Sequence, residues 1–220
     1  MPTPPEFKAP FYPECFYHIV CKSVDGVLLF KEHANYDVFI KRLHQFTYLL
    51  FDVWSYCLLN NHTHHVVKIK SLPDITDAIK NLENKTVSMK SLLSDPGNEQ
   101  LLDVMIERQM NSFLVSFANY TNNKNNRKGG LFQKPFRRKQ IIDENHLQQV
   151  IIYVHANAQK HGLVKNFKEH LYSSYSAILN KNVAFKDVLI FFGGVEAFKN
   201  IHQSQVEYYY SNNWPSSKLE

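Results

Sequence analysis

The chain has 220 residues, of which 44% are hydrophobic and 14% aromatic, enough to bury the core of one main domain with an appendage. This composition argues against a disordered chain, and no uninterrupted apolar stretch is long enough to cross a bilayer. The formal net charge of +5 permits a polyanionic partner without demanding one.

The first predicted elements are a strand, a helix and a hairpin. Alternation around Tyr17, Ile19 and Cys21 predicts a strand over residues 16–22, and residues 27–30 extend it or form a short turn. Apolar residues at helical spacing predict a helix over 35–50. Asn60-Asn61 joins two apolar runs, 53–59 and 62–69. Because Asn tolerates positive φ in a short turn, this pattern predicts an antiparallel hairpin. Helices over 72–90 and 101–120 follow, with a loop over 91–100 between them.

The second half begins with a basic segment and ends in helices. Residues 121–140 contain seven Lys or Arg and no Asp or Glu, and their composition predicts a flexible loop over 122–130 and an edge strand over 132–142. Asp143 is a suitable N-cap for a helix over 144–160, and Gly162 suits its end. Short helices are predicted over 171–179, 185–191 and 195–209, the last two separated by Gly193-Gly194.

Three cysteines and the first residues bear on location. Cys15, Cys21 and Cys57 are widely separated and lack metal-ligand spacing, which favours reduced, inert thiols. Residues 1–6 lack the basic and apolar regions of a signal peptide. We therefore expect a cytoplasmic protein with no membrane partner.

The most reactive side chains lie on two of these elements. Because strand side chains alternate, His62 and His64 share one side, where they could hold a metal ion, and His65 faces away. A chance His-x-His triplet is the alternative in a chain with 11 histidines. Tyr153 and Asn157 are spaced i, i+4 beside the buried stripe of their helix, so both can point into one cleft.

Five motifs in the same order resemble the REP-associated tyrosine transposases, which are single-strand transposases of the HUH superfamily. They are Tyr17-His18-Ile19-Val20, residues 56–64 (YCLLNNHTH), residues 130–138 (GLFQKPFRR), residues 153–164 (YVHANAQKHGLV) and Ser173-Ser174-Tyr175. The resemblance runs from about Tyr12 to His202. It departs from the family at Asn60 and Ala158, which are usually Pro, and at Thr63, which is usually hydrophobic.

The resemblance implies an α+β fold. The expected architecture is a ferredoxin-like sandwich, with an antiparallel four- to five-stranded sheet and helices on one face, plus a C-terminal helical extension. We expect the catalytic domain over 1–165 and the extension over 166–220, packed on or near it.

The resemblance also implies metal-dependent nicking and rejoining of single-stranded DNA at hairpin-associated sites. Tyr153 would be the nucleophile that forms a 5′-phosphotyrosine link, and His62, His64 and Asn157 would hold Mg²⁺ or Mn²⁺. Basic residues are candidates for phosphate contacts, with a solvated charged face as the alternative: Lys128, Lys134, Arg137, Arg138 and Lys160.

Two other functions are open at this stage. One is a catalytically silent hairpin DNA-binding protein of the same fold, since Thr63 and the missing prolines depart from the family. The other is a metal hydrolase that uses His62, His64 and His65 without a protein adduct. A homodimer is also open, and with it whether the tyrosine helix acts on its own histidines or on a partner's.

Overall fold

The computed structural model describes residues 7–211, with side chains up to Tyr208. Four strands form one antiparallel sheet in the order β2-β3-β1-β4: β1 (Phe16–Lys22), β2 (Phe51–Leu59), β3 (His62–Ile69) and β4 (Arg137–Ile141). The β1–β2 connection contains α1 (His33–Thr47), and the β3–β4 connection contains α2 (Leu72–Lys80), α3 (Val87–Ser94) and α4 (Glu99–Lys124). This β-α-β-β-α-β order is ferredoxin-like, and it confirms the predicted α+β class and antiparallel sheet.

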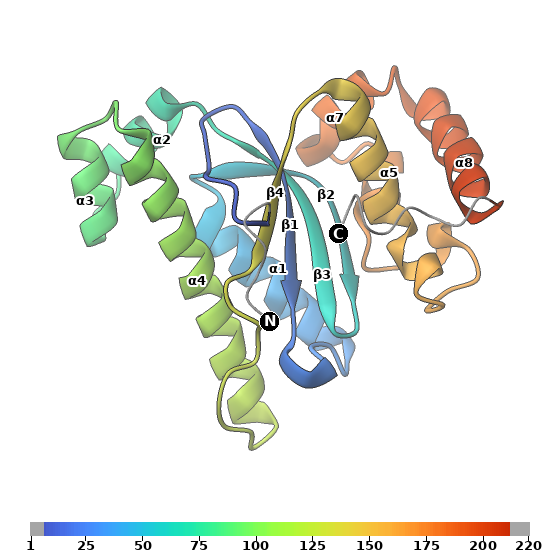
Figure 1. Cartoon of the computed structure of the whole chain (residues 1–220), viewed down its shortest axis with the longest axis horizontal. Coiled ribbons are helices and arrows are strands. Elements are labelled where there is room, and N and C mark those ends of the chain that lie inside the picture. Colours follow the sequence, from blue (N-terminus) through green and yellow to red (C-terminus); the bar gives the residue numbers. More distant parts are fainter. Residues whose placement is uncertain (1–6, 212–220) are drawn as a thin grey trace.

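Helices cover both faces of the sheet, with α4 on one side and α5 (Glu144–Lys160) on the other (Figure 1). On the first face, Tyr17 and Val67 share a core cluster with Phe39 of α1 and Phe113 of α4. On the second face, Val66 shares a cluster with residues of α5. The expectation of helices on one face only is therefore wrong, because the strands carry apolar side chains on both sides and each side needs a cover.

The C-terminal helices complete the second core. They comprise η3 (Phe167–Glu169), α6 (Ser174–Leu179), η4 (Val183–Phe185), α7 (Lys186–Phe191) and α8 (Val195–Ser211). Their buried side chains join the cluster that contains the apolar side of α5. Residues 166–211 therefore pack on the sheet domain, whereas residues 1–6 of the expected domain and 212–220 of the expected extension lie outside the described residues.

Most predicted elements are confirmed, and one is split. Leu59 pairs with His62 across the Asn60-Asn61 turn, as expected of a hairpin. The single helix predicted over 72–90 is instead α2 and α3, with a break at residues 81–86 and a new N-cap, where Thr86 Oγ1 accepts from the Met89 amide. Residues 24–26 form a short 3₁₀ turn.

Two of the cysteines are buried free thiols. Burial raises the pKa of Cys21 and of Cys57 to about 12, so both are unreactive near neutral pH. Among the helices within residues 7–211, none combines the length and the apolar character that crossing a membrane requires.

Candidate active site

The histidines of β3 divide between the two faces of the sheet. His64 is 1% exposed and lies on the face covered by α5, and His62 precedes it on the same side. The ring of His65 lies on the other face, 5.9 Å from that of Phe39, and its Nε2 is 3.0 Å from Thr63 Oγ1. His65 thus belongs to the first core, and the ligand set of the hydrolase alternative does not form.

One strip of α5 runs along the histidine pair. The Tyr153 ring meets that of His64 edge-on, with centroids 5.7 Å apart, and His161, just beyond the helix, lies 4.8 Å from His62. Asn157 is one turn from each of these two residues on the same side of the helix. The structure thus brings Tyr153 to His64 and His161 to His62, and Asn157 lies on the helix strip between these two contacts.

The atoms of this cluster suit a divalent cation. His62 Nδ1 lies 2.7 Å from Asn61 Oδ1, which can only accept, so the proton is on Nδ1 and the lone pair on Nε2. His64 Nε2 and Asn157 Oδ1 are buried and have no hydrogen-bond partner, while Asn157 Nδ2 donates to the Tyr153 carbonyl at 2.9 Å. Two imidazole nitrogens and one amide oxygen fit Mn²⁺ or a similar ion.

The protonation state of His64 is also that of a ligand. Burial, followed by the charges of neighbouring histidines, lowers the pKa of His64 well below its usual range, so its ring is neutral at physiological pH. Among the residues that the structure describes, no three His, Cys, Asp or Glu side chains meet as a metal site. Asn157 is accordingly essential to the predicted ligand set.

Lys160 lies beside the predicted nucleophile. Its Nζ is 3.4 Å from Tyr153 Oη and 5.0 Å from the centre of the tyrosine ring. Tyr153 itself has no exposed surface. A phosphate that reached Oη would therefore meet the Lys160 ammonium as well.

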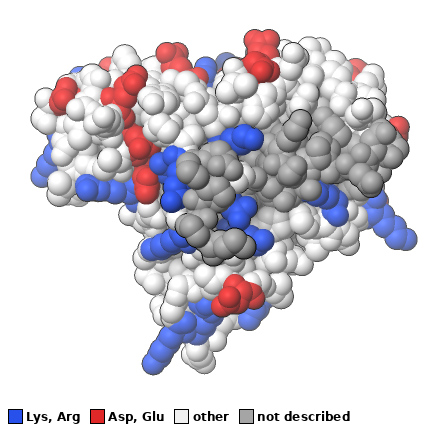
Figure 2. Space-filling model, in the orientation of Figure 1, with Lys and Arg blue, Asp and Glu red and all other residues white. Residues whose placement is uncertain are grey.

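Arg137 borders the histidines, and the loop lysines lie farther out. A hollow of about 70 Å³ is lined by Val20, Lys22, His62, His64, Arg137 and His161. Lys128 and Lys134 are exposed on the segment before β4. Figure 2 shows Lys and Arg side chains across the centre and lower part of one face of the molecule. Lys22 and Arg137 therefore give the wall of the hollow two positive side chains.

Arg138 occupies the opposite face from Arg137 and does not reach the hollow. It is 5% exposed, its guanidinium lies 3.1 Å from Glu107 and 3.3 Å from Asp103 of α4, and its Nε donates to the Ala9 carbonyl. The expectation that Arg138 contacts DNA is therefore wrong. Adjacent strand residues point to opposite sides, so Arg138 faces α4 while Arg137 faces the histidines. The ion pairs of Arg138 hold β4 against α4.

A buried hydrogen-bond chain fixes the back of α5. His202 Nδ1 lies 2.8 Å from the Phe198 carbonyl, which can only accept, so His202 Nε2 accepts from His155 Nδ1 at 2.9 Å. His155 Nε2 in turn accepts from Ser174 Oγ at 2.8 Å, and Ser174 Oγ accepts from the Tyr56 amide. This chain joins the tyrosine helix to α6, α8 and β2.

Sequence reasoning missed three residues of the site. Lys22 and His161 line the hollow, and His18 Nε2 lies 2.9 Å from His64 Nδ1. His161 continues the spacing of Tyr153 and Asn157 by four further residues, a signal that was present in the sequence. His18 required knowledge of which strand lies beside β3.

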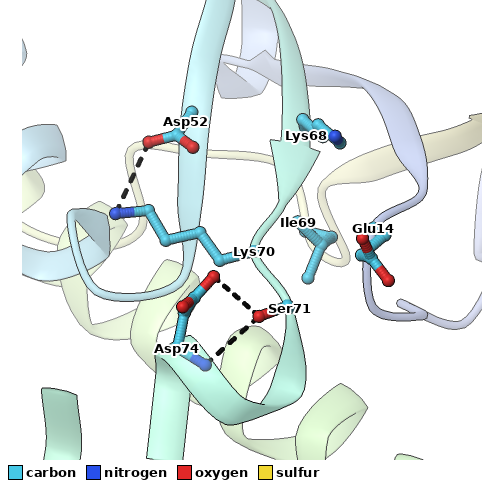
Figure 3. A pocket seen from close by; sticks show the side chains of 7 residues that line it. All are labelled: Glu14, Asp52, Lys68, Ile69, Lys70, Ser71 and Asp74. Atoms are coloured by element: carbon cyan, nitrogen blue, oxygen red, sulfur yellow. Dashed lines mark hydrogen bonds and ion pairs between the residues drawn. The ribbon is translucent and has the colours of Figure 1, made fainter. Parts of the chain in front are cut away.

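Two larger hollows lie away from these histidines. One, of about 530 Å³, is lined mainly by α1, β2 and residues 177–185. The other, of about 310 Å³, lies at the far end of β3, where Lys70 pairs with Asp52 and Ser71 Oγ bonds to Asp74 (Figure 3). Asp52 and Asp74 already have partners, and neither hollow is lined by Tyr153, His62 or His64.

Fold and site together define a class: an α+β protein in which a tyrosine helix packs against a His-x-His strand. No family model and no curated protein matches the chain. Among solved structures, a REP-associated tyrosine transposase bound to a REP hairpin is similar, with a TM-score of 0.55 and 11% identity. The match covers 78% of this chain and 83% of that one, and it shows a shared fold.

Proposed function

We propose that this chain is a metal-dependent tyrosine nuclease that nicks and rejoins single-stranded DNA beside hairpins, as a transposase does. The observation that carries the proposal is the contact between the Tyr153 and His64 rings at 5.7 Å, with Asn157 one turn further along α5. The hairpin DNA in the similar structure supports the choice of substrate. We assign catalysis to the 1–165 domain and support of the tyrosine helix to the described helices of the 166–220 extension, and a cytoplasmic location stays a prediction.

In the proposed reaction, Tyr153 Oη attacks the scissile phosphorus and the bond to the 3′ oxygen breaks. The phenol gives its proton to solvent, the 3′ oxygen takes one up, and the DNA 5′ phosphate stays on the tyrosine. Lys160 stabilises the negative charge that develops on Oη. Mg²⁺ or Mn²⁺ held by His62, His64 and Asn157 would polarise the phosphate. Attack by a 3′-hydroxyl reverses the step and rejoins the strand.

The proposed DNA path follows the basic residues that remain accessible. Arg137 and Lys160 would contact phosphates next to the scissile bond, and Lys128 and Lys134 phosphates farther away. Because Tyr153 and His64 of one chain are already in contact, the centre needs no residue from a second copy. The proposal therefore favours action within one chain, and a homodimer is not required for it.

A catalytically silent DNA-binding protein is the second candidate. The complete burial of Tyr153 favours it, because DNA reaches Oη only if the protein around this residue opens. The two candidates share the fold and the basic residues, and they differ in whether a covalent adduct forms.

A denaturing gel separates the candidates. We expect labelled single-stranded DNA with a hairpin, incubated with the full chain and Mn²⁺, to yield a nicked strand and a protein-linked strand. Tyr153→Phe, which keeps the ring and removes the nucleophile, should yield neither. Equal cleavage by both proteins refutes the tyrosine mechanism, and hairpin binding without cleavage by the parent supports the silent protein.

A further inference from the structure

His18 forms a buried contact with His64 that the predicted metal site does not include. It is 4% exposed and lies on β1, where the neighbouring Val20 pairs with His64 across the sheet. His18 therefore points to the same face, one diagonal step from His64. Its Nε2 lies 2.9 Å from His64 Nδ1, which is a hydrogen-bond distance.

The two rings are oriented for a hydrogen bond within their planes. They are inclined by only 17°, and their centroids are 5.1 Å apart. Combined with an N···N distance of 2.9 Å, this separation places both nitrogens close to the line that joins the centroids. The rings therefore lie side by side, and the bonded hydrogen can point straight at the lone pair of the acceptor.

The direction of this hydrogen bond decides what His64 Nε2 can do. If His18 donated, the ring proton of neutral His64 would lie on Nε2, which is a buried atom with no acceptor. If His64 Nδ1 donates, Nε2 keeps its lone pair and can bind a cation. We propose that His18 accepts this proton and so sets His64 in the tautomer and orientation that a metal ligand needs.

His62 supports this reading, because it has an equivalent partner. Asn61 Oδ1 accepts from His62 Nδ1 and leaves the lone pair on Nε2. Metal-binding histidines commonly donate their second ring N–H in this way, and loss of the acceptor typically costs 10- to 100-fold in metal affinity. His18 also touches the nucleophile, since its ring lies edge-on to Tyr153 at 5.9 Å. It is therefore a positioning residue of the proposed centre.

Manganese binding by the full chain without DNA tests this role. His18→Phe keeps a ring against Tyr153 and removes the acceptor, whereas His18→Gln is the matched control that retains an acceptor. In calorimetric titrations we expect His18→Phe to bind Mn²⁺ about 10- to 100-fold more weakly than the parent. His18→Gln should stay close to the parent. Parent-like affinity of His18→Phe overturns the inference.

A second measurement needs no variant and no metal. The ¹⁵N imidazole spectrum of the unmodified protein reports which nitrogen of His64 carries the proton, and we expect Nδ1. A proton on Nε2 overturns the inference even if His18→Phe fails to fold.

The inference rests on the metal site of the proposed function, and the two can fail separately. Equal Mn²⁺ affinity of the parent and His64→Ala rejects the metal site. A metal site lost in His64→Ala but intact in His18→Phe rejects the role of His18 alone.

Discussion

Lowering the pH from 7.5 to 5.5 should weaken the native state through His202, which lies outside the proposed site. Burial lowers the pKa of His202 from 6.5 to about 3, an effect that its bond to the Phe198 carbonyl only partly offsets. In the unfolded chain the ring titrates near its usual pKa of about 6.5. Above pH 6.5 the His202 ring is neutral in both the native and the unfolded state. Below it, the ring binds a proton in the unfolded state and stays neutral in the native state.

The difference between the folded and the unfolded pKa of His202 sets how much stability is lost at low pH. At pH 5.5, one unit below the unfolded pKa, protonation of His202 in the unfolded state lowers the free energy of unfolding by about 1.4 kcal/mol. The loss continues as the pH falls toward the folded pKa of about 3. Burial also lowers the pKa of His155, which acts in the same direction, so the total loss exceeds the contribution of His202 alone.

Urea unfolding at pH 7.5 and pH 5.5 measures the contribution of His202 to the loss of unfolding free energy, with His202→Gln as the control. The amide oxygen of Gln can accept from His155 Nδ1, as His202 Nε2 does, but the side chain does not titrate. We expect the parent to lose about 1.4 kcal/mol more than His202→Gln between pH 7.5 and 5.5. Equal losses in the two proteins would refute the assignment of a buried, neutral His202.

Three further predictions concern charged residues. Arg138→Met should lower the free energy of unfolding by about 1–3 kcal/mol, because the Ala9 carbonyl and the part-buried Asp103 carboxylate lose their donor; an unchanged urea midpoint contradicts this. Arg137→Met should leave stability nearly unchanged and reduce the salt dependence of single-stranded DNA binding by about 0.7 in log–log slope, as measured by fluorescence anisotropy. Lys160→Met should slow single-turnover cleavage about 100-fold through lost charge stabilisation at Tyr153, and a parent-like rate excludes that role.

The hairpin and the tyrosine helix were predictable because their patterns are local. Alternation in a strand depends only on backbone geometry, so His62 and His64 had to share a face and His65 had to leave it. The spacing of Tyr153 and Asn157 likewise follows from the helical repeat. The break between α2 and α3 escaped prediction because apolar spacing continued weakly across it.

Arg137 and Arg138 mark the boundary of what local pattern can say. The residue order shows that two adjacent strand residues point to opposite faces, yet it does not say which face meets α4 and which meets the histidines. Packing of α4 supplied the answer, since Glu107 lies 31 positions before Arg138 in the chain. Which sheet face Arg137 or Arg138 lies on is therefore decided by the packing of the helices on the sheet.

Sequence pattern was sufficient for which side chains share a strand face or a helix strip, because those relations are set within a few residues. It could not place α5 against β3, join His18 to His64 across the β1–β3 pairing, or cover the second sheet face with the C-terminal helices. These contacts connect segments that are far apart in the chain; His18 and His64, for example, are 46 residues apart. They arise only when burial of apolar side chains on both faces of the sheet brings those segments together.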